Sequence, residues 1–199
     1  MRALLTRVNN VLRAVHETTP VYRPVKIDTI LAAVCQCGIV GKIDLIESDM
    51  DPQVLLAQLI QRKVDGISIA EIYYSKHADK PTQRVCIAKE VIHIFDVDDE
   101  KTTIQSVERL LEDLTVDGLL FTNPQMKSEK RAIFGAIELL ISYEARAVLR
   151  GSWVEARYDH KTLAAAFVVP ETIMKLALSD GYHEEIEKIR AELDLKMIA

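Results

Sequence analysis

Apolar residues recur every three or four positions along much of the chain, which is the spacing that places them on one side of an amphipathic helix. Near the start, a helix over residues 2–17 would gather one such side from Leu4, Leu5, Val8, Val11, Leu12 and Val15. The same spacing, with local start and stop signals, predicts further helices at residues 28–37, 52–63, 83–95, 100–114, 129–149, 160–169, 170–178 and 183–193.

Residues that favour helix ends mark several of these boundaries. Pro52 suits a first turn, where its missing N–H would have no partner inside the helix. Thr82 and Ser128 stand just before two of the predicted helices, where a hydroxyl can cap free backbone N–H groups. Gly151 is expected to close the long helix that begins after Ser128.

Two segments in the first half of the chain have the composition of strands. They are "IVGKIDLIES", residues 39–48, with a turn expected at the following "DMDP", and "GISIAEIYYS", residues 66–75. Alternation in the first and branched and aromatic side chains in the second are typical of β-structure. The pattern therefore predicts an α+β fold that is mostly helical, with a small β-sheet in its first half.

Composition excludes several classes of protein. The 199 residues are 49% hydrophobic and 28% charged, which predicts a globular protein; we expect an N-terminal helix at 1–20 and a domain at 21–199. The longest apolar run, residues 163–169, is too short to cross a bilayer, so we expect a soluble cytoplasmic protein without a membrane partner. A net charge of −5 argues against a general nucleic-acid-binding protein.

The chain contains three cysteines, Cys35, Cys37 and Cys86. An odd number does not make a complete disulfide framework, and one residue between Cys35 and Cys37 is fewer than structural zinc sites use. Two positions apart in a predicted helix, these two side chains point to different faces. We therefore expect all three to be reduced, buried thiols.

The segment "RVCIAKEVIHIFD", residues 84–96, carries the candidate chemistry. Glu90 and His93 stand in the order of the metallopeptidase motif His-Glu-x-x-His, with Lys89 in place of the first histidine. On a helix, that motif aims two imidazoles at one zinc ion and places the glutamate beside the metal-bound water. A third protein ligand completes the zinc site, and the glutamate then acts as the general base.

These residues belong to a wider resemblance that spans about residues 27–180. The chain resembles the ImmA/IrrE-type metallopeptidases, which bacteria and mobile elements such as phages encode, often beside a repressor that they cleave. The segment "EKRAIFGAIELLIS", residues 129–142, is similar to that family's third-ligand helix, with Glu129 at the ligand position. Ala132 also matches, whereas Gly135 and Ser142 depart from the family's phenylalanine and proline. The segment "LAAAFVVPETIMKLAL" looks like the helical region that follows.

The resemblance implies a zincin-like domain in which His93 and Glu129 are metal ligands and Glu90 is the candidate base. Lys89 alters that expectation, because a charged ammonium has no lone pair to offer a metal. In a metal-free site, Lys89 would instead pair with Glu129 and also with Glu90. Alternatively, Asp96 joins His93 and Glu129 as a substitute ligand, and the cofactor is then zinc or a harder divalent ion.

Three functions follow as hypotheses. The first is an inactive metallopeptidase-like protein that binds a repressor, an antitoxin or a host defence protein. The second is an active zinc endopeptidase that cleaves such a partner through an altered ligand set. The third is a helix-turn-helix DNA-binding regulator formed by residues 163–178, although Glu171 stands where a recognition helix would approach DNA. Residues 2–17 offer a further surface for partner binding or self-association.

Overall fold

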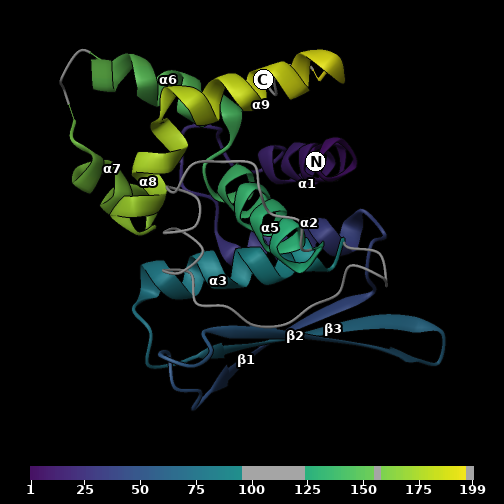
Figure 1. The fold of residues 1–199 in the computed structure, drawn as a ribbon. Helices are drawn as coiled ribbons and strands as arrows, with labels where there is room; N and C mark the ends of the chain where they lie inside the picture. Colours follow the sequence, from purple (N-terminus) through teal and green to yellow (C-terminus); the bar gives the residue numbers. More distant parts are fainter. Residues whose placement is uncertain (96–123, 155–157, 196–199) are drawn as a thin grey trace.

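The computed structural model describes residues 1–95, 124–154 and 158–195, and in these residues eight helices accompany one three-stranded sheet (Figure 1). The α+β fold with its sheet in the first half is as predicted. The helices are α1 (Arg2–His16), α2 (Ile27–Gln36), α3 (Lys80–His93), α5 (Pro124–Leu140), α6 (Tyr143–Val154), α7 (His160–Phe167), α8 (Glu171–Leu178) and α9 (Asp180–Glu192). The strands are β1 (Lys42–Ser48), β2 (Ala57–Val64) and β3 (Ile67–Ser75).

The sheet has the order β1-β3-β2, with β3 parallel to β1 and antiparallel to β2. Ile72 of β3 lies opposite Leu45 of β1 and Leu59 of β2, so these three side chains share one face. Helix α3 packs on this sheet, and Ile72 is fully buried. The sheet therefore supports the helix that carries Lys89, Glu90 and His93.

The helix predicted over residues 52–63 is wrong, because residues 57–64 form strand β2. Local apolar spacing indicated a helix, but the segment pairs along its whole length with β3. The connection is Asp65-Gly66, and both residues have positive φ, 51° and 81°. An Asp-Gly pair between apolar segments is a strong hairpin signal, because glycine adopts positive φ at little cost.

The single long helix predicted over residues 129–149 is also wrong. Helix α5 begins earlier, at Pro124, and ends at Leu140, and α6 then starts at Tyr143. The Ser142 hydroxyl accepts a hydrogen bond from the Ala145 N–H at 3.2 Å, which caps α6 in the way typical of serine. Ser142 therefore marks a helix start that the apolar spacing conceals.

The remaining boundaries differ from the predictions by smaller amounts. Helix α3 begins at Lys80, and its cap is Asp79, whose carboxylate accepts from the Thr82 N–H at 2.7 Å; Thr82 itself is not the cap. Gly151 lies inside α6 and does not close it. The helix predicted over residues 100–114 lies outside the described residues.

The apolar face of α1 packs inside the chain. Leu5, Val8, Val11, Leu12 and Val15 are all buried, and α1 contacts both α2 and α5. The apolar face of residues 2–17, considered above for self-association, is therefore buried in the chain's own core. None of the helices in the described part of the chain is both long and apolar enough to cross a membrane.

Candidate functional site

Helices α3 and α5 bring four ionisable side chains together in the interior. Lys89, Glu90 and His93 lie on α3, Glu129 lies on α5, and each is only 5% exposed. The two helices pack directly against each other. We call these four residues the α3–α5 cluster.

Lys89 is the central cation of the cluster. Its Nζ lies 3.0 Å from Oε2 of Glu129 and 3.2 Å from Oε1 of Glu90. Burial alone would lower the pKa of the Lys89 ammonium, but the charges of Glu90 and Glu129 outweigh burial and raise that pKa above its ordinary value. Lys89 is therefore held as a charged hydrogen-bond donor.

Glu129 contacts both Lys89 and His93 of α3. One carboxylate oxygen accepts from Lys89, and the other, Oε1, lies 3.3 Å from Nε2 of His93. Burial would raise the pKa of Glu129, but its contacts with His93 and Lys89 outweigh that effect and lower the pKa. The pairing of Lys89 with Glu129, and with Glu90, agrees with the metal-free interpretation of the motif.

The residues of the cluster do not fit a zinc ion as they stand. Only His93 and Glu129 occupy expected ligand positions, and the third position holds an ammonium that donates to the carboxylate a metal would need. Nowhere in residues 1–95, 124–154 and 158–195 do three or more His, Cys, Asp or Glu side chains form a group suited to a metal. The proposed substitute ligand, Asp96, lies outside the described residues.

Close packing of α3 on α5 depends on Gly135. A Cβ built there would lie 2.7 Å from Cδ1 of Ile92, a distance that real Cβ atoms essentially never show. Ile92 is one residue from His93, and Gly135 is six residues along α5 from Glu129. The absence of a side chain at Gly135 thus lets Ile92 approach α5, and this close packing holds the α3 residues of the cluster near Glu129. The sequence marked Gly135 only as a departure from the family pattern.

The substitution Gly135→Ala is expected to lower the free energy of unfolding by about 1–3 kcal/mol, because the added methyl group overpacks the α3–α5 contact. A second change, Ile92→Val in the Gly135→Ala background, is expected to recover part of the loss. Chemical denaturation of the two single variants and the double variant measures both the loss of stability and its partial recovery. Additive effects of the two changes would contradict direct contact between them.

Comparison of the chain with protein-family models, with curated proteins and with solved structures found no match. The resemblance to ImmA/IrrE-type metallopeptidases therefore rests on the motifs of the sequence. What the fold contributes is the position of Glu129: a residue 40 positions from Lys89 in the chain lies in hydrogen-bond contact with it.

The cysteines supply no second site. All three are free thiols, as expected, but only Cys86 is buried; Cys35 is half-buried and Cys37 is exposed. The prediction that all three are buried is therefore wrong for Cys37, which ends its helix at the surface. Burial raises the pKa of the Cys86 thiol to about 12, so Cys86 is an inert neutral group near Lys89.

Two short helices do form in the segment considered for DNA binding. Helices α7 and α8 pack together, and Val168 between them adopts a left-handed conformation with φ of 52°. Lys175 on α8 pairs with Glu171 at 2.7 Å, which places a carboxylate beside that basic group. Lys175 therefore lies beside an acidic side chain, an arrangement that does not favour contact with DNA phosphates.

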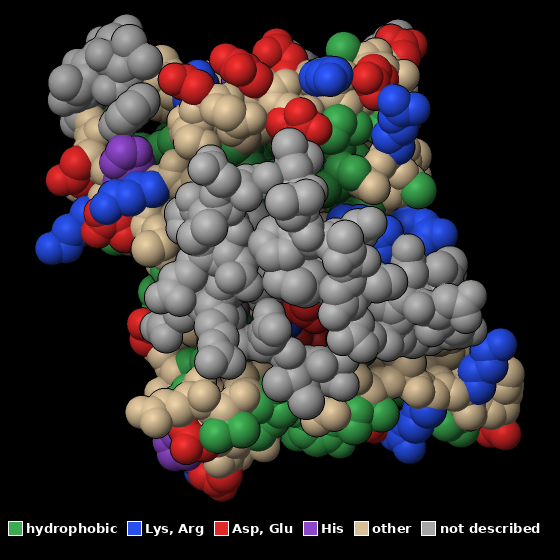
Figure 2. All heavy atoms as spheres, viewed as in Figure 1, with side chains coloured by type: hydrophobic (Ala, Val, Ile, Leu, Met, Phe, Trp, Pro, Cys, Tyr) green, Lys and Arg blue, Asp and Glu red, His purple; other side chains and the backbone are tan. Residues whose placement is uncertain are grey.

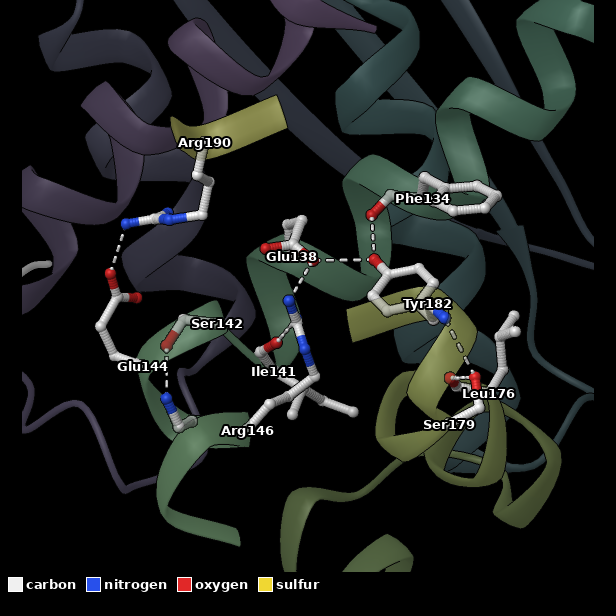
Figure 3. A network of polar contacts seen from close by, with 11 residues as sticks. Phe134, Glu138, Ile141, Ser142, Glu144, Arg146, Leu176, Ser179, Tyr182 and Arg190 are labelled. Atoms are coloured by element: carbon white, nitrogen blue, oxygen red, sulfur yellow. Dashed lines mark hydrogen bonds and ion pairs between the residues drawn. The ribbon is translucent and has the colours of Figure 1, made fainter. Parts of the chain in front are cut away.

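A second buried charge network was missed by the sequence analysis (Figure 3). Arg146 of α6 is fully buried and pairs with Glu138 of α5 at 2.7 Å; Glu138 also accepts from the Tyr182 hydroxyl of α9 at 2.8 Å. Arg190 of α9 pairs with Glu144 of α6 at 2.8 Å. The only local signal was charged residues inside the apolar segment 136–149. These contacts join three helices, including the one that carries Glu129.

Proposed function

We propose that this chain is an ImmA/IrrE-like protein that has lost peptidase activity and binds a regulatory or defence protein. The observation that carries the proposal is the Lys89 ammonium, buried between Glu90 and Glu129 at a position where the motif requires a metal ligand. A charged ammonium repels a divalent cation and supplies no lone pair. It satisfies the buried carboxylates that a metal would otherwise neutralise.

The contacts of Glu90 support the same conclusion. A general base needs an oxygen directed at an activated water, and in zinc peptidases the metal lowers the pKa of that water toward neutrality. Here Oε1 of Glu90 lies 3.2 Å from the Lys89 ammonium. That contact favours a structural role for Glu90, in which it balances the charge of Lys89.

The class of partner comes from the resemblance. Peptidases of this type engage repressors, and a protein that keeps the fold without the chemistry is suited to hold such a partner intact. We therefore place this chain in the cytoplasm, encoded by a phage or another mobile element, with a repressor, an antitoxin or a host defence protein as its partner. Fold-level analogy is the basis for this step.

Zinc binding distinguishes this proposal from an active enzyme. We expect the native chain to purify without stoichiometric metal and to show no change in melting temperature when zinc is added. The variant Lys89→His is expected to take up one equivalent of zinc and to melt at a higher temperature with it, because ligand bound to the folded state stabilises it. The matched control Lys89→Met should show neither effect. A full equivalent of metal in the native chain would overturn the proposal.

Integrity of the partner is the second readout. A protein recovered with the native chain is expected to stay full length during prolonged incubation with zinc, as judged by intact mass. Zinc-dependent fragments that disappear in Glu90→Gln would establish the alternative, an active endopeptidase with an altered ligand set. One observation favours that alternative: the two expected metal ligands His93 and Glu129 already lie in contact.

A further inference from the structure

The sheet presents one face to the helices and the other away from them. Because Ala70 and Ile72 face α3 and are fully buried, the alternate residues of β3 point to the opposite side, which we call the outer sheet face. Six of its side chains are apolar: Ile46, Ile60, Val64, Ile67, Ile69 and Tyr73. No described helix covers this face (Figure 1), and hydrophobic side chains gather along the lower border of the sheet (Figure 2).

At the end of the β2–β3 hairpin, the polar side chains lie on the helix side of the sheet and the apolar side chains lie on the outer face. On the side of the sheet that faces the helices, the positions near the tip are Gln61, Lys63 and Ser68. On the outer face, Val64 and Ile67 lie directly opposite each other and are 41% and 55% exposed. A sheet with one solvated face normally alternates apolar inward and polar outward. Near the hairpin tip the apolar side chains are on the outer face and the polar ones on the helix side, which favours contact of the outer face with another molecule.

The charges of the outer sheet face are balanced. Lys42 pairs with Asp44 at 2.8 Å, and Arg62 pairs with Glu71 across the β2–β3 ladder. These two cations and two anions leave no excess charge to attract a nucleic acid, an anionic membrane or an acidic peptide. They also allow two identical faces to meet without like-charge repulsion, since each cation can approach a carboxylate of the other copy.

We propose that the outer sheet face binds the outer sheet face of a second copy of this chain. Three strands of about eight residues cover about 27 by 14 Å, a footprint of about 400 Å² on each copy. The total of about 800 Å² is below the roughly 1,200–2,000 Å² that stable interfaces bury. The dimer is accordingly weak and reversible, and Val64 and Ile67 lie at the hairpin end of its interface. It lies across the sheet from the α3–α5 cluster and does not depend on the function proposed for that cluster.

Sedimentation or light scattering from dilute to concentrated solution tests the inference. The mass of the native chain is expected to rise from one chain toward two and to resist high salt, because the contact is apolar. The double variant Val64→Lys/Ile67→Lys should stay at the mass of one chain. The control Val54→Lys, at a residue that is 70% exposed and precedes β2, should dimerise like the native chain.

Folding of the variants is checked by circular dichroism and thermal melting. Both substituted residues of the double variant are substantially exposed, so its melting temperature should match that of the control. If the double variant does not fold, Ile60→Lys, at another exposed position of the outer sheet face, replaces it with the same expected loss of dimer. A native chain that stays monomeric at its highest concentration would overturn the inference. So would a folded outer-face variant that dimerises like the control.

Discussion

Replacing Lys89 by methionine is expected to lower the free energy of unfolding by about 3–5 kcal/mol. Methionine has a similar length but no charge, so the change leaves Glu90 and Glu129 buried without the Lys89 cation, and His93 remains as a partner of Glu129. Removing one partner of a buried ion pair costs far more than the pair contributes, because the remaining charge stays desolvated. Equilibrium denaturation with urea at neutral pH measures the loss.

The loss should shrink as the solution is acidified. The pKa of Glu129 is lowered in the folded native chain, so its stabilising contribution is complete above the ordinary carboxyl range and disappears as the pH falls through the lowered value. In Lys89→Met, protonation removes the carboxylate charges that Lys89 no longer balances. The stability curves of the two proteins are therefore expected to converge at low pH.

An exposed lysine provides the matched control. Lys76 pairs with Asp49 at 2.7 Å, but both side chains are largely solvated, so Lys76→Met should leave stability almost unchanged. If Lys89→Met and Lys76→Met lowered the free energy of unfolding equally, the buried contacts of Lys89 would add no more stability than an exposed ion pair. A loss in Lys89→Met that persists undiminished at low pH would also contradict an electrostatic origin.

The second large effect is expected at Arg146, where the change to methionine should also cost about 3–5 kcal/mol. This side chain is fully buried, forms an ion pair with Glu138 at 2.7 Å and donates a hydrogen bond to the Ile141 carbonyl at 2.6 Å. Burial raises the pKa of Glu138 even though Arg146 opposes that rise. Without Arg146, the Glu138 carboxylate has the Tyr182 hydroxyl as its remaining donor in this network.

A double-mutant cycle isolates the Glu138–Arg146 contact. The double variant Glu138→Gln/Arg146→Met should recover much of the loss, because the amide oxygen can still accept from Tyr182 and no unpaired charge remains. Arg150→Met is the control on the same helix, where a partly exposed pair with Asp180 predicts a change within about 1 kcal/mol. Additive single effects in the cycle would mean that the buried pair is not coupled.

The candidate site could be predicted further than much of the fold around it. The resemblance placed Glu129 at the third-ligand position, and the metal-free alternative then predicted the Lys89–Glu129 ion pair that the structure contains. This succeeded because opposite charges at motif positions must satisfy each other when buried. Gly135 could not be interpreted in the same way, since its importance comes from Ile92 of another helix.

Sequence alone determined the elements whose signals are local. The apolar spacing of α1 and the helices near the C-terminus, and the composition of β3, needed no knowledge of distant residues. Tertiary structure decided the rest. Residues 57–64 form strand β2 despite their helical spacing, because β3 supplies hydrogen-bond partners along their length; the Asp65-Gly66 turn was the local sign of this hairpin. The Glu138–Arg146 network exists only where α5, α6 and α9 meet. Local pattern specifies which face of a segment is apolar, but the partner that covers that face comes from elsewhere in the chain, and its pairing and packing energies then decide the conformation.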